Sequence, residues 1–248
     1  NVRFALSDLL CNQEKGDAVL KEDFKPIKKV GEEHWWEGYN PTHRYAIAAD
    51  VSKGVGKDHS STVALDFSGE KASVVVSFKS NQENPIALAH RIANQGENLG
   101  TCIAAPENNS IGYATVAKLR EIYPEGKIYQ YQKKDKARQG NPTDYGWVTT
   151  SANKADMMYD LINAFNDDKL EVYDPRILKE MKEYTHGDIH ASSAEKDKRA
   201  KLGGSHFDLL IALAIAYQMK HNSRPGGGRA RSMERRQKRK QTKKRNFR

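Results

Sequence analysis

The stretch Tyr45–Ser52 (YAIAADVS) constrains the fold more than any other part of the chain. Its run of small and apolar residues follows the breaker Pro41 and predicts a buried strand. Asp50 lies at the end of this run, although aspartate is depleted in strands and is almost never fully buried without a partner. Two interpretations are open from this stretch alone. Asp50 either hydrogen-bonds its own loop or is a metal ligand where a central strand opens into a loop.

Length and composition set broad limits on the class of protein. A chain of 248 residues is long enough for one large domain or two small ones. With 38% hydrophobic and 29% charged residues, it contains no apolar run of the roughly 18–20 residues that a membrane span needs. The N-terminus shows no signal-peptide pattern, so we expect a cytoplasmic protein. Cys11 and Cys102 match no zinc spacing and are expected to be free thiols.

The positive charge is concentrated at the C-terminus. Residues 223–248 contain 12 Lys and Arg and one Glu, which leaves 29 basic and 31 acidic residues in 1–222. This tail has little to bury and is expected to be disordered. It would bind nucleic-acid phosphates in a salt-dependent manner, or else act as a solubility tail or a docking arm for an acidic protein.

The hydrophobic pattern predicts a β-meander followed by alternating helices and strands. Residues 1–43 are interpreted as an extended lead-in whose Trp35 and Trp36 pack against the core. Such an order implies an α/β fold with a mixed sheet covered by helices on both faces, as in the ribonuclease H-like fold. Strands are expected at 45–51, 62–67, 72–78, 101–105, 127–131 and 170–173, and helices at 85–95, 110–123, 153–165, 177–184 and 205–219.

Acidic residues lie at the carboxyl ends of predicted strands, where α/β sheets usually bind their ligands. Glu107 follows the strand at 101–105, and Asp50 ends the first strand, so the two acids converge if those strands are neighbours. Asp208 lies in the first turn of the last helix, after Ser205 as the expected N-cap. It either favours the helix dipole or, because this helix is apolar all round, faces the core and binds a cation. Asp58 is a candidate fourth member.

Carboxylates that converge repel one another, and their pKa values rise unless cations bind. Oxygen ligands without His or Cys suit Mg²⁺ or Mn²⁺. Two such ions about 4 Å apart clamp the attacking and leaving oxygens of a phosphodiester. Together with the basic tail, the acids therefore predict metal-dependent cleavage of nucleic acid.

Other polar residues near the acids have simpler structural roles as alternatives. Gly54–Lys57 looks like a phosphate loop, but Asp58 replaces the required Ser or Thr, so the chain shows no ATPase motif. His59 and His206 are interpreted as structural hydrogen-bonding residues. The candidate DNA contacts are Lys53, Lys57, Arg199 and Lys201, with a solvated loop as the alternative for the last two.

Several segments together resemble the nuclease domain of large terminase subunits, the DNA-packaging motors of tailed bacteriophages. The resemblance covers roughly 44–220. Phe207 stands where many relatives carry a second acid, which leaves the metal stoichiometry open. The segments are Asp50 with Ser52, Gly54 and Asp58; Glu107 with Asn108 and Gly112; Gly146-Trp147-Val148-Thr149 leading to Lys154; and His206-Phe207-Asp208-Leu209 with Ala212-Leu213-Ala214.

The resemblance implies a domain organisation and a mechanism. Residues 1–43 would connect to an upstream ATPase domain, 44–222 would form the nuclease domain and 223–248 the tail. Asp50, Glu107 and Asp208 would be the catalytic metal ligands, with Asp58 as a further ligand. A metal-activated water would attack the phosphate and leave 5′-phosphate and 3′-hydroxyl ends.

The resemblance also implies a biological setting. Concatemeric viral DNA would be cut in the host cytoplasm, with double-stranded DNA, a portal protein and a small terminase subunit as partners. The isolated chain is expected to be a monomer with no membrane contact. Two alternatives stay open: another ribonuclease H-like nuclease of the resolvase or transposase type, and a non-catalytic nucleic-acid-binding module.

Overall fold

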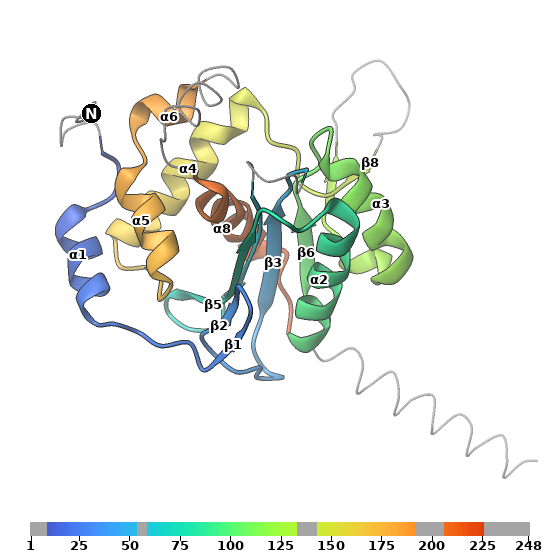
Figure 1. Ribbon diagram of the computed structural model, residues 1–248, viewed down its shortest axis with the longest axis horizontal. Helices are drawn as coiled ribbons and strands as arrows, with labels where there is room; N and C mark the ends of the chain where they lie inside the picture. Colours follow the sequence, from blue (N-terminus) through green and yellow to red (C-terminus); the bar gives the residue numbers. More distant parts are fainter. Residues whose placement is uncertain (1–8, 54–58, 133–142, 192–205, 226–248) are drawn as a thin grey trace, which may run out of the picture.

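The computed structural model describes residues 9–53, 59–132, 143–191 and 206–225 (Figure 1). Its centre is a seven-stranded sheet in the spatial order β1-β2-β5-β4-β3-β6, with β9 paired to β5. A separate two-stranded sheet joins β7 to β8. The strands are β1 (Lys28–Val30), β2 (Glu33–Trp35), β3 (Tyr45–Asp50), β4 (Ser60–Asp66), β5 (Ala72–Ser80), β6 (Ile103–Pro106), β7 (Gln130–Gln132), β8 (Thr143–Tyr145) and β9 (Leu170–Glu171).

The main sheet is mixed, as the sequence predicts. Strands β3, β4 and β5 form an antiparallel meander, whereas β6 runs parallel to β3 and β9 parallel to β5. A parallel bridge between Ala104 and Ile128 continues the sheet beyond β6. This strand order confirms the α/β architecture expected for a ribonuclease H-like domain.

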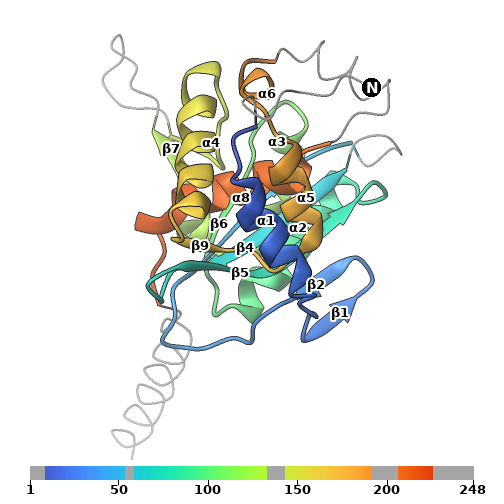
Figure 2. The same cartoon turned by 90° about the vertical axis from the view of Figure 1, so that its left-hand side faces the viewer.

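Helices cover both faces of the sheet. Figure 1 shows α8 on one side of β3 and α2 on the other, and Figure 2 shows α1 and α5 lying in front of the sheet. None of the helices in the described part of the chain is both long and apolar enough to cross a membrane. The helices are α1 (Gln13–Lys21), α2 (Pro85–Asn98), α3 (Gly112–Ile122), α4 (Ser151–Asn166), α5 (Pro175–Glu183), α6 (His186–His190) and α8 (Asp208–Gln218), with 3₁₀ turns η2 (Glu125–Lys127) and η3 (Met219–His221).

Alternation along β3 divides the hydrophobic core into two parts. Ala46 and Ala48 belong to the core that contains α4, α5 and α8, whereas Ile47 and Ala49 belong to the core that contains α2 and α3. Because side chains in a strand alternate between faces, Asp50 lies on the same face as Ala46 and Ala48. The carboxylate at the end of β3 therefore faces α8.

The segment before β3 is more regular than the expected extended lead-in. It contains α1, which Asn12 caps by accepting a hydrogen bond from the Lys15 amide, and the β1–β2 hairpin, which lengthens the sheet. Trp35 and Trp36 are buried, as predicted, and the Trp36 Nε1 donates to Ser77 Oγ at 2.9 Å. A connection to an upstream ATPase domain stays a prediction.

The end of the described chain packs against the domain. Ser223 is buried and its backbone amide donates to the Met219 carbonyl at 3.0 Å, and Pro225 forms an isolated bridge with Arg44. These residues, assigned above to the tail, thus belong structurally to the domain. Since Arg44 precedes β3, Pro225 lies at the end of the sheet opposite to Asp50. Residues 226–248 lie outside the described part of the chain.

Removing buried volume from α8 should destabilise the domain. Ile215 of α8 is fully buried in the core that contains α4, α5 and α8, so Ile215→Ala is expected to lower the free energy of unfolding by about 2–4 kcal/mol. Ile86, also in a helix, is 46% exposed, and Ile86→Ala should cost less than about 1 kcal/mol. Urea unfolding followed by circular dichroism measures both. Equal losses would contradict the packing described for α8.

Candidate metal centre

Three neighbouring strands place Asp50, Ser61 and Lys79 in one row. The β3–β4 register pairs Asp50 with Ser61, and the β4–β5 register pairs Ser61 with Lys79. Residues that are directly opposite in adjacent strands project from the same face of the sheet, with Cβ atoms about 5 Å apart. All three side chains therefore face α8.

Glu107 extends this row on the other side of Asp50. Ala49 pairs with Pro106 in the parallel β3–β6 register, and the Glu107 amide donates to the Ala49 carbonyl at 2.8 Å. Ala105 lies in the α8-side core, so Glu107, two residues later, is on the same face. Adjacent strands are about 4.8 Å apart, so the sheet places the carboxylate-bearing residues Asp50 and Glu107 next to each other.

Trp147 holds the backbone around Glu107 from the side opposite to β3. The Trp147 amide donates to the Pro106 carbonyl at 2.8 Å, and the Asn108 amide donates to the Trp147 carbonyl at 2.6 Å. Gly146 has a φ of +85°, and a Cβ there would lie 2.6 Å from the Pro106 carbonyl oxygen. The Gly146-Trp147 pair, noted in the sequence, thus brings Trp147 into an isolated parallel bridge with Glu107 that fixes the position of Glu107.

Asn109 and Gly112 fix the carboxylate and the turn that follows it. Asn109 Nδ2 donates to Glu107 Oε2 at 2.9 Å, while Asn109 Oδ1 accepts from the Ile111 and Gly112 amides. A Cβ on Gly112 would lie 1.9 Å from the Glu107 carbonyl oxygen, so only glycine fits there. Asn109 is a functional candidate that the sequence analysis missed, although an Asn two residues after a strand-end acid is a signal for such a turn.

Asp208 approaches the row from α8. It is the first residue of the helix, and its backbone carbonyl accepts a hydrogen bond from Ser61 Oγ at 2.8 Å. The expected N-cap Ser205 is wrong: Phe207 is the N-cap and makes no side-chain capping bond. Ser61, which is opposite Asp50 in the β3–β4 register, thus joins the first turn of α8 to the row.

Two further charged residues, both unexpected from the sequence, lie against Asp208. Lys79 Nζ is 3.0 Å from Asp208 Oδ2 and donates to Glu180 Oε1 at 2.7 Å, and Glu180 Oε2 accepts from the Leu210 amide at 2.8 Å. Burial raises the pKa of Glu180 to about 7, against the opposing effect of Lys79. His59 Nδ1 lies 3.7 Å from Asp208 Oδ2. Residue spacing alone could not reveal Lys79 or Glu180, since β5 and α5 meet α8 only in the folded chain.

The arrangement fits a divalent cation in part. Asp50 and Glu107 are neighbours on one face, with oxygen donors that suit Mg²⁺ or Mn²⁺. Among the residues that the structure describes, however, no three His, Cys, Asp or Glu side chains are grouped as a metal site. The Asp208 carboxylate is paired with Lys79 instead, so it would have to change partner to become the third ligand.

The remaining predicted site residues are placed only in part. Lys53 is exposed and lies three residues beyond Asp50, close enough in sequence to border the row. Four others fall outside the described residues: Asp58, Lys57, Arg199 and Lys201.

Comparison of the whole structure with solved proteins identifies the fold. The large terminase nuclease of thermophilic phage G20c with bound magnesium matches with a TM-score of 0.59 and 17% identity, over 85% of this chain and 97% of that one. This chain has the fold of a large terminase nuclease domain. The large terminase nuclease domain of Thermus phage P74-26 matches with a TM-score of 0.53 and 18% identity, over 83% and 94% of the two chains.

The similarity is one of structure, because no protein-family model and no curated protein matches the sequence. It confirms the resemblance noted in the sequence at the level of the fold. It also confirms the ribonuclease H-like arrangement of the sheet.

Filling the space at Gly112 should disturb the turn that carries Glu107. Because the new Cβ would overlap the Glu107 carbonyl oxygen, Gly112→Ala is expected to lower the free energy of unfolding by about 1–3 kcal/mol. Gly126 has no neighbour within 4 Å of its ideal Cβ position, so Gly126→Ala should change stability by less than about 0.5 kcal/mol. Guanidinium unfolding of both variants tests this, and an unaffected Gly112→Ala protein would refute the close approach.

Proposed function

We propose that this domain is a metal-dependent DNA endonuclease of the large terminase type that cuts concatemeric viral DNA during genome packaging. The observation that carries the proposal is the row on the α8 face of the sheet. Glu107 and Asp50 lie side by side there, and Asp208 is joined to the same row through Ser61. The terminase-nuclease fold supports the same activity.

In this proposal the three acids share the work of holding Mg²⁺ or Mn²⁺, with two ions expected. Asp50 lies between Glu107 and the Ser61–Asp208 link, so it is the acid best placed to be shared. When bound, the ions would activate water and stabilise the leaving oxygen, which gives 5′-phosphate and 3′-hydroxyl ends. Asn109 would keep the Glu107 carboxylate oriented, and Ser61 would keep the first turn of α8 against the sheet.

The proposed partners follow from charge and from the family. Double-stranded DNA would meet the exposed Lys53 beside the acids, together with Lys57, Arg199 and Lys201. A portal protein, a small terminase subunit and an upstream ATPase domain complete the proposed assembly in the host cytoplasm. Since residues 1–222 carry 29 basic and 31 acidic residues, the domain should hold DNA weakly by itself.

One observation favours a non-catalytic alternative. Lys79 already forms ion pairs with both Asp208 and Glu180, so part of the acidic group has a partner within the protein, as in a structural network. In that case the acids only hold the fold, and the basic residues 226–248 do all the binding. Cleavage assays of the full chain and of a chain without residues 226–248 separate this alternative from a nuclease.

The decisive experiment is cleavage of supercoiled plasmid in Mg²⁺, Mn²⁺ or EDTA. We expect nicking and linearisation in either metal and none in EDTA. Asp50→Asn should reduce the rate by at least about 100-fold, because the ions supply several kcal/mol of charge stabilisation. Asp167→Asn removes the same charge from an exposed position at the end of α4 and should leave the rate unchanged.

Each alternative has its own outcome in this experiment. Deletion of 226–248 should weaken DNA binding but leave metal-dependent cutting, whereas the non-catalytic alternative predicts that no cutting occurs in any metal. Preference for a four-way junction over plain duplex would instead indicate a resolvase-type nuclease. Cutting that survives in Asp50→Asn would contradict the proposed ligand set.

A further inference from the structure

Lys79 places a positive charge beside the acids of the candidate metal centre, where carboxylates alone would be expected to bind a cation. Its ammonium lies 3.0 Å from Asp208 Oδ2 and 2.7 Å from Glu180 Oε1. Its side chain is only 17% exposed, and the side chains of Glu180 and Asp208 are 8% and 15% exposed. Although burial lowers the pKa of Lys79, the two carboxylates outweigh this effect and raise it above its ordinary value. A fixed positive charge is therefore built into the edge of the candidate metal centre.

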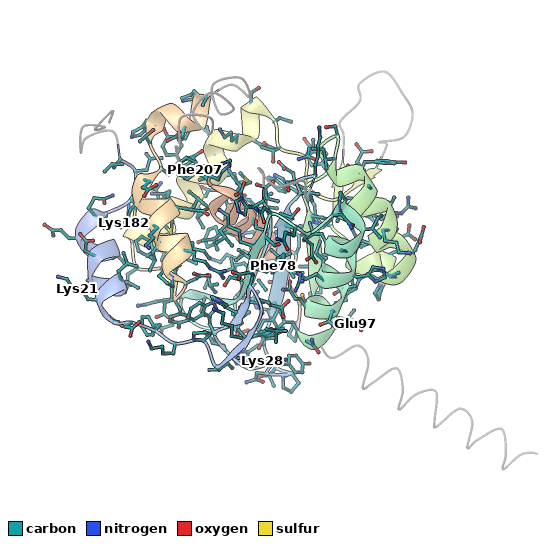
Figure 3. All side chains as sticks on the ribbon, in the orientation of Figure 1. Lys21, Lys28, Phe78, Glu97, Lys182 and Phe207 are labelled. Atoms are coloured by element: carbon teal, nitrogen blue, oxygen red, sulfur yellow. The ribbon has the colours of Figure 1, made fainter. Side chains whose placement is uncertain are left out.

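Glu180 holds this charge in place and connects it to α8. Its second carboxylate oxygen accepts from the Leu210 amide in the first turn of α8, where Phe207 provides no side-chain cap. A carboxylate at this position satisfies an unpaired amide and favours the positive end of the helix dipole. Figure 3 labels Phe78 and Phe207, the residues that precede Lys79 and Asp208, and shows side chains filling the space around them. Glu180 thus fixes both partners of the Lys79–Asp208 ion pair.

Lys79 and a divalent cation bound at this site would both interact with the Asp208 carboxylate. Lys79 stands at one end of the row and Glu107 at the other, with Asp208 held near the middle by Ser61. Asp208 can balance the ammonium or a metal ion, but a carboxylate shared by both binds each less strongly. A positive charge this close also opposes the binding of another cation.

We propose that Lys79 is a positioning residue that competes with the divalent cation for the Asp208 carboxylate, and that Glu180 sets this competition by holding the ammonium from its other side. This inference rests on the proposed function. It makes Asp208 the adjustable member of the site, whereas Asp50 and Glu107 are fixed by the sheet. In this proposal Lys79 lowers the affinity for the cation and Glu180 raises it, whereas a purely structural salt bridge would not have these opposite effects.

The test is Mn²⁺ binding to the full chain without DNA, measured by isothermal titration calorimetry at pH 8. Lys79→Gln removes the competitor and should bind Mn²⁺ about 10-fold more tightly than the wild type. Glu180→Gln keeps an acceptor for the Leu210 amide but leaves Lys79 to Asp208 alone, so its affinity should fall about 3-fold or more. Both variants should melt at lower temperature than the wild type in EDTA.

The matched control is Lys71→Gln, the same change of charge beside the opposite end of β5. Lys71 pairs with Asp168 at 2.7 Å and lies eight residues from Lys79, a distance of about 26 Å along the strand. Its Mn²⁺ affinity should stay within about twofold of the wild type, because the charge removed is too far away to act.

The outcomes separate the inference from the proposed function. If the wild type binds Mn²⁺ and Asp50→Asn abolishes this binding, the metal site is supported. If the wild type binds no Mn²⁺, the proposed function itself is refuted. If the wild type binds but Lys79→Gln and Glu180→Gln shift the affinity in the same direction, or not at all, the competition is refuted. Should Lys79→Gln fail to fold, the affinity of Glu180→Gln decides by itself, and an affinity equal to or tighter than that of the wild type overturns the inference.

Discussion

The hydrogen-bonded register of β3 with its two neighbours determines where the charged side chains of this domain lie. Because β4 pairs antiparallel and β6 parallel to β3, Glu107, Asp50 and Ser61 come to one face at one end of the sheet. A shift of one residue in either pairing would turn these side chains to the α2 face. Ser61 then links the row to α8, and the close contact of Gly112 with Glu107 fixes the row's outer end.

Burial of charge explains why the same region contains both acids and a lysine. Helix α8 is apolar and packs on the sheet, so the charged groups at its first turn lose contact with water. Charges in such a place persist only when they are paired and hydrogen-bonded. Lys79, which Glu180 holds from its other side, provides this pairing for Asp208, and Asn109 donates a hydrogen bond to the Glu107 carboxylate.

The parts of the structure that depend on local pattern could be predicted from sequence, and the parts that depend on long-range register could not. The strand that ends at Asp50 and the strand that precedes Glu107 stand out as apolar runs, and their meeting follows from general rules for sheets. Helix α1 and the β1–β2 hairpin are short and polar, so they carry little periodic signal. Lys79 and Glu180 gain their role only when β5, α5 and α8 meet.

Asp50 and Glu107 are proposed to bind divalent cations at this end of the sheet. Anomalous X-ray scattering from crystals of the protein soaked in Mn²⁺ would locate such ions. A manganese peak is expected within about 2.5 Å of carboxylate oxygens of both residues. Crystals that show no manganese there, or manganese only at surface acids elsewhere, would contradict the proposal.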